Sequence, residues 1–400
     1  MKKISVADLK EGLIFSAPVY IEGNNLLVPA GVAVRKKDIT RLNTWGVESV
    51  ETDGVPVTPP PPKAEKAKSP KAASDPAEKA AAPSKEKSSV ISLPEVQENK
   101  AAYRSYLELI DRLDEVCNNI ASAVSVEARS IDNITGRLLQ AVREQRNSYI
   151  GFILGGEIKG HEMAKSLVNT AILSALIAQE LKLPHHKVLQ VVTGALLHDV
   201  GMLRLPKEIV EKKGGLSASE LQRIQSHPLH TYKIVTKELL YPEDVGLIVL
   251  QHHERWDGEG YPRRISTTAI DMGARIVSVA DAFEAMVSQK PYRNSIVGYQ
   301  AMKNLLADNS RRFDPDLLKV FIHIMGIYPI GSIIRLNNGV IARVSEARAE
   351  APLRPKVQVL IDEYKKVYKN EKGVFIDLLI ERHLYITKAM TMKELSELDA

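Results

Sequence analysis

The stretch HHERWDGEGYP occupies residues 252–262 and directly follows the apolar run GLIVL at residues 246–250. Two adjacent histidines and a carboxylate therefore stand at the end of a segment that is predicted to be buried. Imidazole and carboxylate groups are costly to bury unless they are hydrogen-bonded, paired or bound to a metal. The glycines and the proline that follow are typical of a tight loop. We therefore expect a buried polar site where an apolar helix ends and this loop begins.

Three other pieces of the chain also hold ionisable residues in apolar surroundings: LLHDVG with His198 and Asp199, SHPLH with His227, and VSVADAF with Asp281. Each piece alone is most simply a hydrogen-bonded core histidine or a helix-capping aspartate. Together with His252 and His253, they would leave several desolvation penalties uncompensated unless they share a partner, and a metal ion supplies one. Nitrogen and oxygen ligands without a thiolate favour manganese, iron, zinc or a similar divalent ion.

The 400-residue chain divides into four regions by the texture of its sequence. Residues 1–53 alternate short apolar runs with turns around a helix-like piece, KKDITRLNTW, and predict a small α/β module. Residues 54–96 are rich in proline, alanine and lysine and predict a disordered linker. Residues 97–326 repeat apolar residues at helical spacing and predict a helical bundle. Residues 327–400 are strand-like, with an NNG turn, and predict a β-rich appendage that ends in a terminal helix. The expected fold class is mainly α.

Charge and composition exclude several classes of protein. The net charge of +5 is modest, so we expect no binding to a nucleic-acid polymer. The single cysteine, Cys117, excludes a disulfide framework and suits a reducing compartment. The N-terminal MKKISVADLKEG lacks the apolar core of a signal peptide, and no apolar run is long enough to cross a bilayer. We therefore expect a cytoplasmic protein without a membrane span, either a monomer or a homodimer formed through residues 100–150.

Six pieces of sequence follow one another in a specific order: HDVG at 198–201, HP at 227–228, HHERWDGEGYP at 252–262, ARIVSVADAFEAM at 274–286, KPYR at 290–293 and FDP at 313–315. This series resembles the HD-GYP family, whose members are HD-superfamily phosphodiesterases that linearise the bacterial second messenger cyclic di-GMP. The resemblance covers about residues 160–325. It implies an HD-domain helical bundle with two divalent metal ions, manganese or iron in the first place and zinc, nickel or magnesium as alternatives.

The resemblance also implies a role for each matching residue. The metal ligands would be His198, Asp199, His227, His252, His253 and Asp281, with Glu162 as a ligand to an additional metal. Asp199 would bridge two metals, so that His198 and Asp281 complete the first site and the other histidines complete the second. His198, Asp199 and Asp281 would therefore be catalytic. The substrate would be held by Gly258, Gly260, Tyr261, Pro262, Lys290 and Arg293, of which the last two would clamp a phosphate.

Three positions depart from the pattern of the family. Met202 stands where the family has a lysine after the glycine of the HD motif, and Ser166 stands where it has an upstream histidine ligand. Thr231 stands where a glycine usually follows the HP pair. Glu162 lies one turn before Ser166 on the same helical face. We expect the missing ligand to weaken the first metal site and the missing lysine to slow the reaction.

The favoured function is a metal-dependent phosphodiesterase that hydrolyses cyclic di-GMP to linear pGpG and to GMP. One alternative is a receptor that binds cyclic di-GMP without cleaving it and signals through the N-terminal module, which would then bind a regulatory partner. Another alternative is a hydrolase of a different nucleotide phosphoester. Met202 and Ser166 are the positions that discriminate between the first two.

Overall fold

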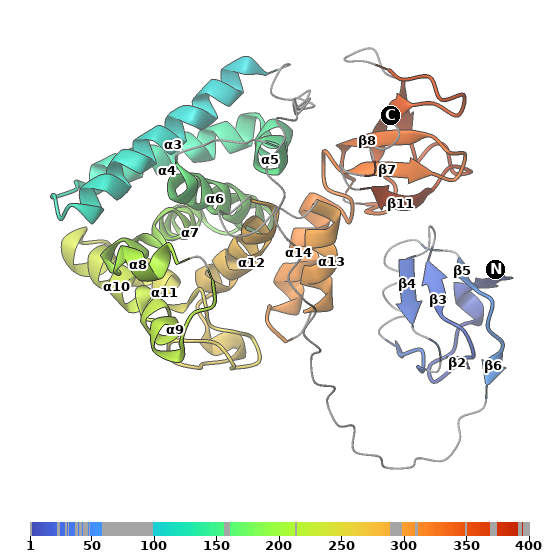
Figure 1. Cartoon of the computed structure of the whole chain (residues 1–400), viewed down its shortest axis with the longest axis horizontal. Coiled ribbons are helices and arrows are strands. Elements are labelled where there is room, and N and C mark those ends of the chain that lie inside the picture. The colour runs from blue at the N-terminus through green and yellow to red at the C-terminus, as the bar shows by residue number, and fades with distance from the viewer. Residues whose placement is uncertain are drawn as a thin grey trace, which may run out of the picture. The chain divides into compact units, whose positions relative to one another are not determined.

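The structure is a computed structural model of the chain (Figure 1). It describes residues 2–57 with gaps at 22–24, 29, 31, 37–38, 40–41, 43–46 and 48, residues 99–390 with gaps at 156–160, 213, 289–297, 309–310, 349 and 369–373, and residue 394. The chain divides into two compact units, Met1–Ser92 and Leu93–Ala400.

The N-terminal unit is built from short antiparallel strands. Its larger sheet has the order β1 (Lys2–Ser5), β5 (Ser49–Thr52), β3 (Val19–Ile21) and β4 (Asn25–Val28), and a smaller sheet pairs β2 (Ile14–Phe15) with β6 (Pro56–Val57). The apolar runs of the sequence supply its core, which includes Phe15, Val19 and Val50. Lys36, Ile39 and Leu42 are helical, as KKDITRLNTW predicts, and the rest of that piece lies outside the described residues.

Strand β6 corrects the predicted start of the linker. Pro56 pairs with Phe15 and Val57 pairs with Ile14, so the module extends to Val57 rather than ending at residue 53. The strand forms because its partner lies far away in the sequence, which the composition of residues 54–96 does not reveal. Residues 58–96, the remainder of the predicted linker, lie outside the described residues.

The helical region forms a bundle, and this confirms the predicted fold class. Its longer helices are α3 (Lys100–Ala121), α4 (Ala128–Glu144), α5 (Arg146–Gly155), α6 (Glu162–Glu180), α7 (His185–Leu197), α11 (Glu243–Gln251), α12 (Met272–Val287), α13 (Gly298–Ala307) and α14 (Pro315–Met325). Shorter pieces connect them: the 3₁₀ helices η2 (Val200–Arg204) and η4 (Thr267–Ala269), the π-helix η3 (Ile234–Glu238), and the α-helices α8 (Lys207–Val210), α9 (Ala218–Ile224) and α10 (His227–Lys233).

Helices α6 and α7 lie at the centre of this bundle (Figure 1). Helix α6 has an unbroken buried run from Leu167 to Ala178, as expected of a helix that is apolar nearly all round. Gly194 lets α7 approach α11, because a Cβ atom at this position would lie 2.5 Å from Cγ2 of Ile248. The C-terminal ends of α7 and α11 therefore come together, and both carry residues of the predicted site.

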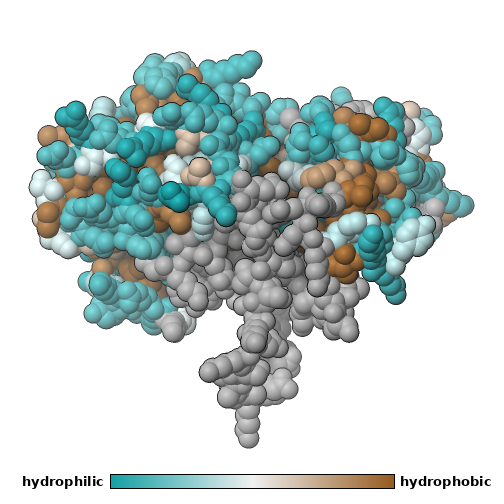
Figure 2. All heavy atoms as spheres, turned by 90° about the horizontal axis from the view of Figure 1, so that it is seen from above, coloured by the Kyte–Doolittle hydropathy of each residue, from teal (hydrophilic) through white to brown (hydrophobic). Residues whose placement is uncertain are grey.

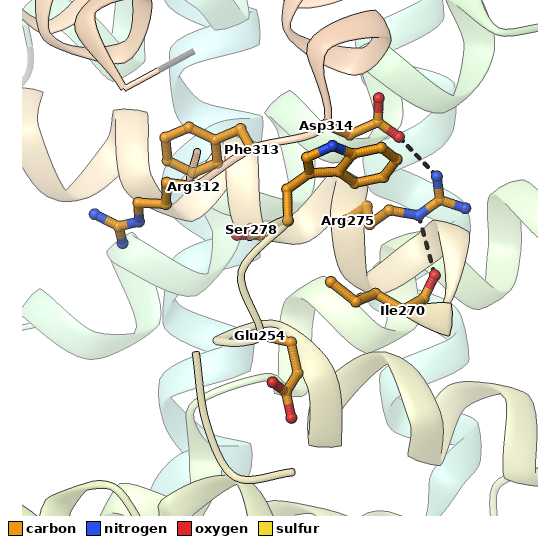
Figure 3. Close-up of a pocket in the computed structure, with 8 residues that line it drawn as sticks. Glu254, Ile270, Arg275, Ser278, Arg312, Phe313 and Asp314 are labelled. Carbon is orange, nitrogen blue, oxygen red and sulfur yellow. Dashed lines mark hydrogen bonds and ion pairs between the residues drawn. The ribbon is translucent and has the colours of Figure 1, made fainter. Parts of the chain in front are cut away.

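The loop after α11 is fastened to α12 and to the segment that precedes α14. Nη1 of Arg275 on α12 lies 2.6 Å from Oδ2 of Asp314, and Nε of Arg275 donates to the carbonyl oxygen of Ile270 at 3.0 Å (Figure 3). The same guanidinium lies 5.7 Å from the ring centre of Trp256. Because the Arg275–Asp314 pair is almost fully buried, it holds these segments together and positions the loop that carries the GYP sequence.

The C-terminal region is an antiparallel sheet of five strands, which confirms the predicted β-rich appendage. Its order is β10 (Phe375–Asp377), β9 (Lys356–Ile361), β8 (Ile341–Glu346), β7 (Ile333–Leu336) and β11 (Ile386–Met390). Gly339 of the NNG turn has a φ of +88° and lies between β7 and β8, as the sequence predicts. Within the predicted terminal helix, Glu394 is the residue that the structure describes, and it is helical.

Figure 2 shows a surface on which hydrophilic residues predominate and apolar residues occur in separate patches. In the described part of the chain, no helix combines the length and the apolar character needed to span a bilayer.

Candidate metal centre

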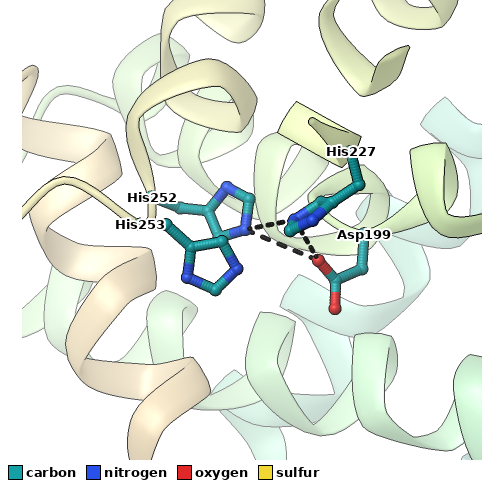
Figure 4. Close-up of side chains that lie close together, drawn as sticks. All are labelled: Asp199, His227, His252 and His253. Carbon is teal, nitrogen blue, oxygen red and sulfur yellow. Dashed lines mark hydrogen bonds and ion pairs between the residues drawn. The ribbon is translucent and has the colours of Figure 1, made fainter. Parts of the chain in front are cut away.

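Most of the predicted ligands stand at the ends of helices, and Asp281 lies inside one. His198 directly follows α7 and Asp199 precedes η2, whereas His227 is the first residue of α10. His252 directly follows α11, and Asp281 lies within α12. Because these helices pack through their apolar faces, their polar ends meet at one place inside the bundle (Figure 4).

Asp199, His227, His252 and His253 form a tight cluster, in which one ligand atom of each lies within 4.8 Å of the others (Figure 4). Nε2 of His227 lies 3.0 Å from Oδ1 of Asp199, and Nε2 of His252 lies 3.5 Å from the same oxygen. The rings of His252 and His253 have centres 4.0 Å apart. This cluster corresponds to the second of the two metal sites implied by the sequence.

His198 and Asp281 lie on the other side of Asp199. Nε2 of His198 is 3.7 Å from Oδ2 of Asp199 and 3.6 Å from Oδ1 of Asp281. Asp199 therefore directs one carboxylate oxygen toward His227 and His252 and the other toward His198. The structure brings together all six residues that the sequence nominates as core ligands, while their roles as ligands stay a prediction.

Three of the imidazoles are oriented in the same way by the backbone. Nδ1 of His198, His227 and His252 lies 2.7, 2.8 and 2.8 Å from the carbonyl oxygen three residues earlier, at Ala195, Ile224 and Val249 respectively. A carbonyl oxygen can only accept, so Nδ1 carries the hydrogen when the ring is neutral. Nε2 then presents its lone pair to the cluster, which is the arrangement typical of a histidine that binds a metal.

The donor atoms of this cluster fit a divalent cation. Oδ1 of Asp199 is buried and accepts no hydrogen bond from the described residues, although two imidazole nitrogens lie close to it. With Nδ1 protonated on both rings, lone pairs face lone pairs around this oxygen. A buried polar atom without a partner is costly, and a cation bound between these atoms would remove that cost.

Electrostatic interactions keep most of the cluster in the form that binds a metal. Burial acts to raise the pKa of Asp199, but the neighbouring His198 and His227 hold it well below its usual range. Burial lowers the pKa of His252, and burial together with His252 and His227 holds the pKa of His253 well below its usual range. At neutral pH an anionic carboxylate therefore faces the neutral imidazoles of His252 and His253.

His198 differs from the other histidines in its charge. Burial acts to lower its pKa, but Asp199 and Asp281 outweigh burial and raise the pKa to about 9. Burial acts to raise the pKa of Asp281, and His198 outweighs it and lowers the pKa to about 2. Without a metal, His198 is therefore a buried imidazolium between the carboxylates of Asp199 and Asp281. Its positive charge compensates these carboxylates, as a bound metal ion would.

Comparison with known proteins identifies the region that holds these residues. Residues 154–317 match the family model of an HD domain, and residues 333–398 match that of a KOW domain associated with an HD domain. The HD match includes His198–Asp199, the other clustered ligands and the GYP sequence of the loop. Residues 154–317 therefore form an HD domain, and the findings support the HD-GYP family.

Two relatives are curated as cyclic di-GMP phosphodiesterases. The chain is 28% identical over 275 residues to PdeB of Borreliella burgdorferi, across 69% of this chain and 72% of that protein. It is 31% identical over 200 residues to one from Pseudomonas aeruginosa, across 50% of this chain and 48% of that protein. A solved structure of an HDG"Y"P protein from Bdellovibrio bacteriovorus aligns with a TM-score of 0.45 and 16% identity, across 80% of this chain and 97% of that one. The chain thus spans most of the length of the Borreliella burgdorferi protein and about half of the length of the Pseudomonas aeruginosa protein.

The loop of the HD-GYP motif folds back onto the metal centre. Gly258 has a φ of +82°, and a Cβ atom on Gly260 would lie 2.4 Å from the backbone nitrogen of Arg255, so both glycines serve the turn. The amide of Gly258 donates to the carbonyl oxygen of Arg255 at 2.9 Å, so this amide is engaged within the loop rather than free for a phosphate. The Tyr261 ring stacks on His253 with centres 4.7 Å apart, and the Tyr261–Pro262 peptide is cis.

Other predicted residues lie away from the cluster or outside the described residues. Glu162 is the first residue of α6, is exposed, and is not in the group of clustered ligand atoms. Lys290 and Arg293 fall within residues 289–297, which are not described. The roles of all three residues stay predictions.

At the position of the upstream histidine, Ser166 contacts a carboxylate that the sequence reasoning missed. Oγ of Ser166 donates to Oε2 of Glu284 at 2.6 Å. Glu284 is fully buried on α12 and also accepts hydrogen bonds from Asn169 and Ser288. The sequence could have indicated Glu284, because it is a second carboxylate one helical turn after Asp281 in an otherwise apolar helix.

A second missed residue is Glu254, the acid of the HHE sequence. Its Oε1 accepts from the amides of Arg263 and Arg264 at 2.6 and 3.1 Å, and its side chain is buried. It therefore closes the loop by joining residue 254 to the residues just after Pro262. Its position directly after two candidate ligands was the available signal.

Proposed function

We propose that this chain is a metal-dependent phosphodiesterase that hydrolyses cyclic di-GMP. The observation that carries the proposal is the position of Asp199, whose Oδ1 faces His227 and His252 while its Oδ2 faces His198. A carboxylate with one oxygen toward each of two ligand groups suits a bridge between two divalent ions. The names of the two relatives support the choice of substrate.

The ligands would be shared between two ions. Asp199 with His227, His252 and His253 would hold one ion, and Asp199 with His198 and Asp281 would hold the other. Such ions, when bound, polarise a phosphoryl oxygen and lower the pKa of water. Because the donors are imidazoles and carboxylates without a thiolate, manganese or ferrous iron suits the set.

The backbone of the protein orients the imidazoles of the centre. The carbonyl bonds to Nδ1 fix three imidazoles before substrate arrives, so little reorganisation is needed during the reaction. Tyr261 covers His253 at the edge of the centre. Hydrolysis adds one water across one phosphodiester bond, leaving a phosphate on one ribose and a hydroxyl on the other. The product is linear pGpG, and a second hydrolysis yields GMP. We place this reaction in the cytoplasm, since a single unpaired cysteine suits a reducing compartment.

A receptor that binds cyclic di-GMP without cleaving it is the second candidate, and two residues favour it. Ser166 is hydrogen-bonded to Glu284 and supplies no imidazole to the first ion. Met202 in η2 carries no charge to stabilise a phosphate. Three protein ligands, including a bridging one, still suffice in many catalytic metal sites, so we prefer a slow enzyme.

The test measures turnover and binding separately. The full chain is purified without added metal, its metal content is measured, and portions are loaded with Mn²⁺ or Fe²⁺ in the absence of oxygen. Each portion is incubated with cyclic di-GMP, and products are separated by chromatography. We expect slow formation of pGpG that stops after addition of a chelator. Binding without turnover in either metal would establish the receptor instead, and absence of both would favour a hydrolase of another phosphoester.

A further inference from the structure

Arg312 lies on a segment that runs beside the HD-GYP loop. The amide of Trp256 donates to the carbonyl oxygen of Arg312 at 3.0 Å, and the amide of Asp257 donates to that of Arg311 at 2.8 Å. Phe313 and Arg312 line a small pocket next to the loop, together with Trp256 and Glu254 (Figure 3). These contacts hold the backbone of Arg312 in a fixed place beside the loop that stacks Tyr261 on His253.

The guanidinium of Arg312 is half-buried and has no ion pair with any described carboxylate. Its Cζ lies 5.1 Å from the ring centre of Phe313, which supports the side chain from one side. The neighbouring arginines differ, because Arg255 is paired with Asp257 and Arg275 is paired with Asp314, each at 2.6 Å. A guanidinium held on an aromatic ring with unused donors is well suited to bind an anion.

The HD-GYP loop connects Arg312 with the metal centre. At one end of the loop, the amide of Trp256 donates to the carbonyl oxygen of Arg312 at 3.0 Å. At the other end, the ring of Tyr261 stacks on His253 with centres 4.7 Å apart. Arg263 and Arg264, which follow Pro262 on the same loop, are exposed and lack such support.

We propose that Arg312 binds the phosphate of cyclic di-GMP that is not being cleaved. A cyclic dinucleotide has two phosphates, so when one lies at the metal centre the other must lie beyond its edge, where Arg312 stands beside Trp256 of the HD-GYP loop. This inference rests on the proposed function, because it takes cyclic di-GMP as the ligand.

The test compares Arg312→Gln with Arg311→Gln in the full chain loaded with Mn²⁺. Arg311 is a matched control, since it is the adjacent arginine, its carbonyl makes the same kind of loop contact, and it is exposed. Binding of cyclic di-GMP is measured by calorimetry in the cold, and KM and kcat are measured where turnover is detectable. We expect Arg312→Gln to weaken binding and raise KM by roughly 10- to 100-fold, the range of a charge-assisted hydrogen bond, with little change in kcat. Arg311→Gln should change both by less than about twofold, because an exposed charge contributes little.

Two additional measurements separate a phosphate contact from a structural effect. Arg312→Lys should recover part of the lost affinity because it keeps the charge, and the difference between wild type and Arg312→Gln should shrink as salt is added. Equal binding by wild type and Arg312→Gln, or a loss that does not depend on salt, would show the inference to be wrong while leaving the proposed function intact. Failure of the wild-type chain to bind or cleave cyclic di-GMP would instead overturn the proposed function and this inference with it.

Discussion

Nε2 of His227 lies 3.0 Å from Oδ1 of Asp199, yet in the neutral ring neither atom carries a hydrogen to donate to the other. The hydrogen of the imidazole is on Nδ1, where the carbonyl oxygen of Ile224 accepts it. In this neutral form of the ring, two lone pairs face each other around a buried oxygen, and His252 adds a third. This arrangement is unfavourable without a cation and favourable with one, which is why the centre is expected to bind metal strongly although its first site lacks a ligand.

The first prediction concerns Asp199. Asp199→Asn keeps the shape of the side chain, but it removes the negative charge and replaces one oxygen with an NH₂ group that can donate to Nε2 of His227. We expect the variant to fold and to lose both ions, since the bridge belongs to both sites. Metal content after purification, measured by elemental analysis, checks this expectation.

Asp257→Asn is the matched control for that variant. Asp257 belongs to the same motif, but it is paired with Arg255 at 2.6 Å and lies outside the cluster. Its variant should retain the metal content of the wild type. Equal metal content in Asp199→Asn and wild type would contradict the assignment of Asp199 as the bridge.

The second prediction concerns protons that leave when metal binds. The pKa of His198 is raised to about 9 in the metal-free chain, so the ring is protonated at neutral pH and must lose its proton to become a ligand. Metal affinity should therefore rise by about tenfold for each pH unit up to a pH of about 9 and then level off. Calorimetric titration with Mn²⁺ in two buffers of different ionisation enthalpy gives the number of protons released.

The same pKa fixes the sign of the pH dependence of stability without metal. The folded-state pKa of His198 lies above its ordinary value of 6.5, so its ion pairs with Asp199 and Asp281 stabilise the fold fully below pH 6.5. That stabilisation is lost as the pH rises through about 9. Metal uptake near neutral pH without release of a proton would show that His198 is neutral in the free protein.

The sequence predicted the core of this centre and not its surroundings, for a physical reason. Polar residues such as His198 and His252 at the ends of apolar helices are visible in the sequence, because burial without a partner would be costly. The contact between Ser166 and Glu284 joins residues 118 positions apart and depends on how α6 and α12 pack. Arg312 looks like any surface cation in the sequence. The structure shows that the amide of Trp256 donates to its carbonyl oxygen, and that its guanidinium has no partner among the described carboxylates. The sequence motifs thus predict which ligand residues come together, whereas the packing of the helices determines which other side chains contact them.

The third prediction restores the two residues missing from the family pattern. In Ser166→His, Glu284 is already in place to accept a hydrogen bond from the new imidazole, because Oγ of Ser166 lies 2.6 Å from its Oε2. The other ring nitrogen is then available as the missing ligand. We expect higher metal content and faster turnover, and Met202→Lys added to it should raise turnover again by roughly 100- to 1000-fold through charge stabilisation.

Ser166→Ala provides the control, since it removes the hydroxyl without adding a ligand. It should lower the free energy of unfolding by about 1 kcal/mol, because Glu284 loses one of its donors, and it should leave metal content unchanged. If Ser166→His behaves like Ser166→Ala in metal content, the imidazole does not reach the first site and this reading of Ser166 is wrong.

The last prediction concerns Thr231, the third departure from the family pattern. Its Oγ1 accepts from the amide of Gly201 at 3.0 Å and donates to the carbonyl oxygen of His227 at 3.0 Å. It therefore connects the turn that follows Asp199 with the helix that begins at His227, the two residues whose atoms meet across the centre. Thr231→Val keeps the volume and removes both hydrogen bonds, so we expect the free energy of unfolding to fall by about 1–2 kcal/mol and metal affinity to fall at least tenfold.

Thr193→Val separates this positioning role from a general loss of stability. Thr193 is also buried, and its Oγ1 shares a hydrogen bond of 3.3 Å with Thr135 away from the centre. Its variant should lose stability without a change in the affinity for Mn²⁺, whereas Thr231→Ser should restore affinity because it keeps the hydroxyl. A parallel loss of affinity in both valine variants would mean that metal binding follows overall stability, and Thr231 would then have no special part in holding Asp199 and His227 in register.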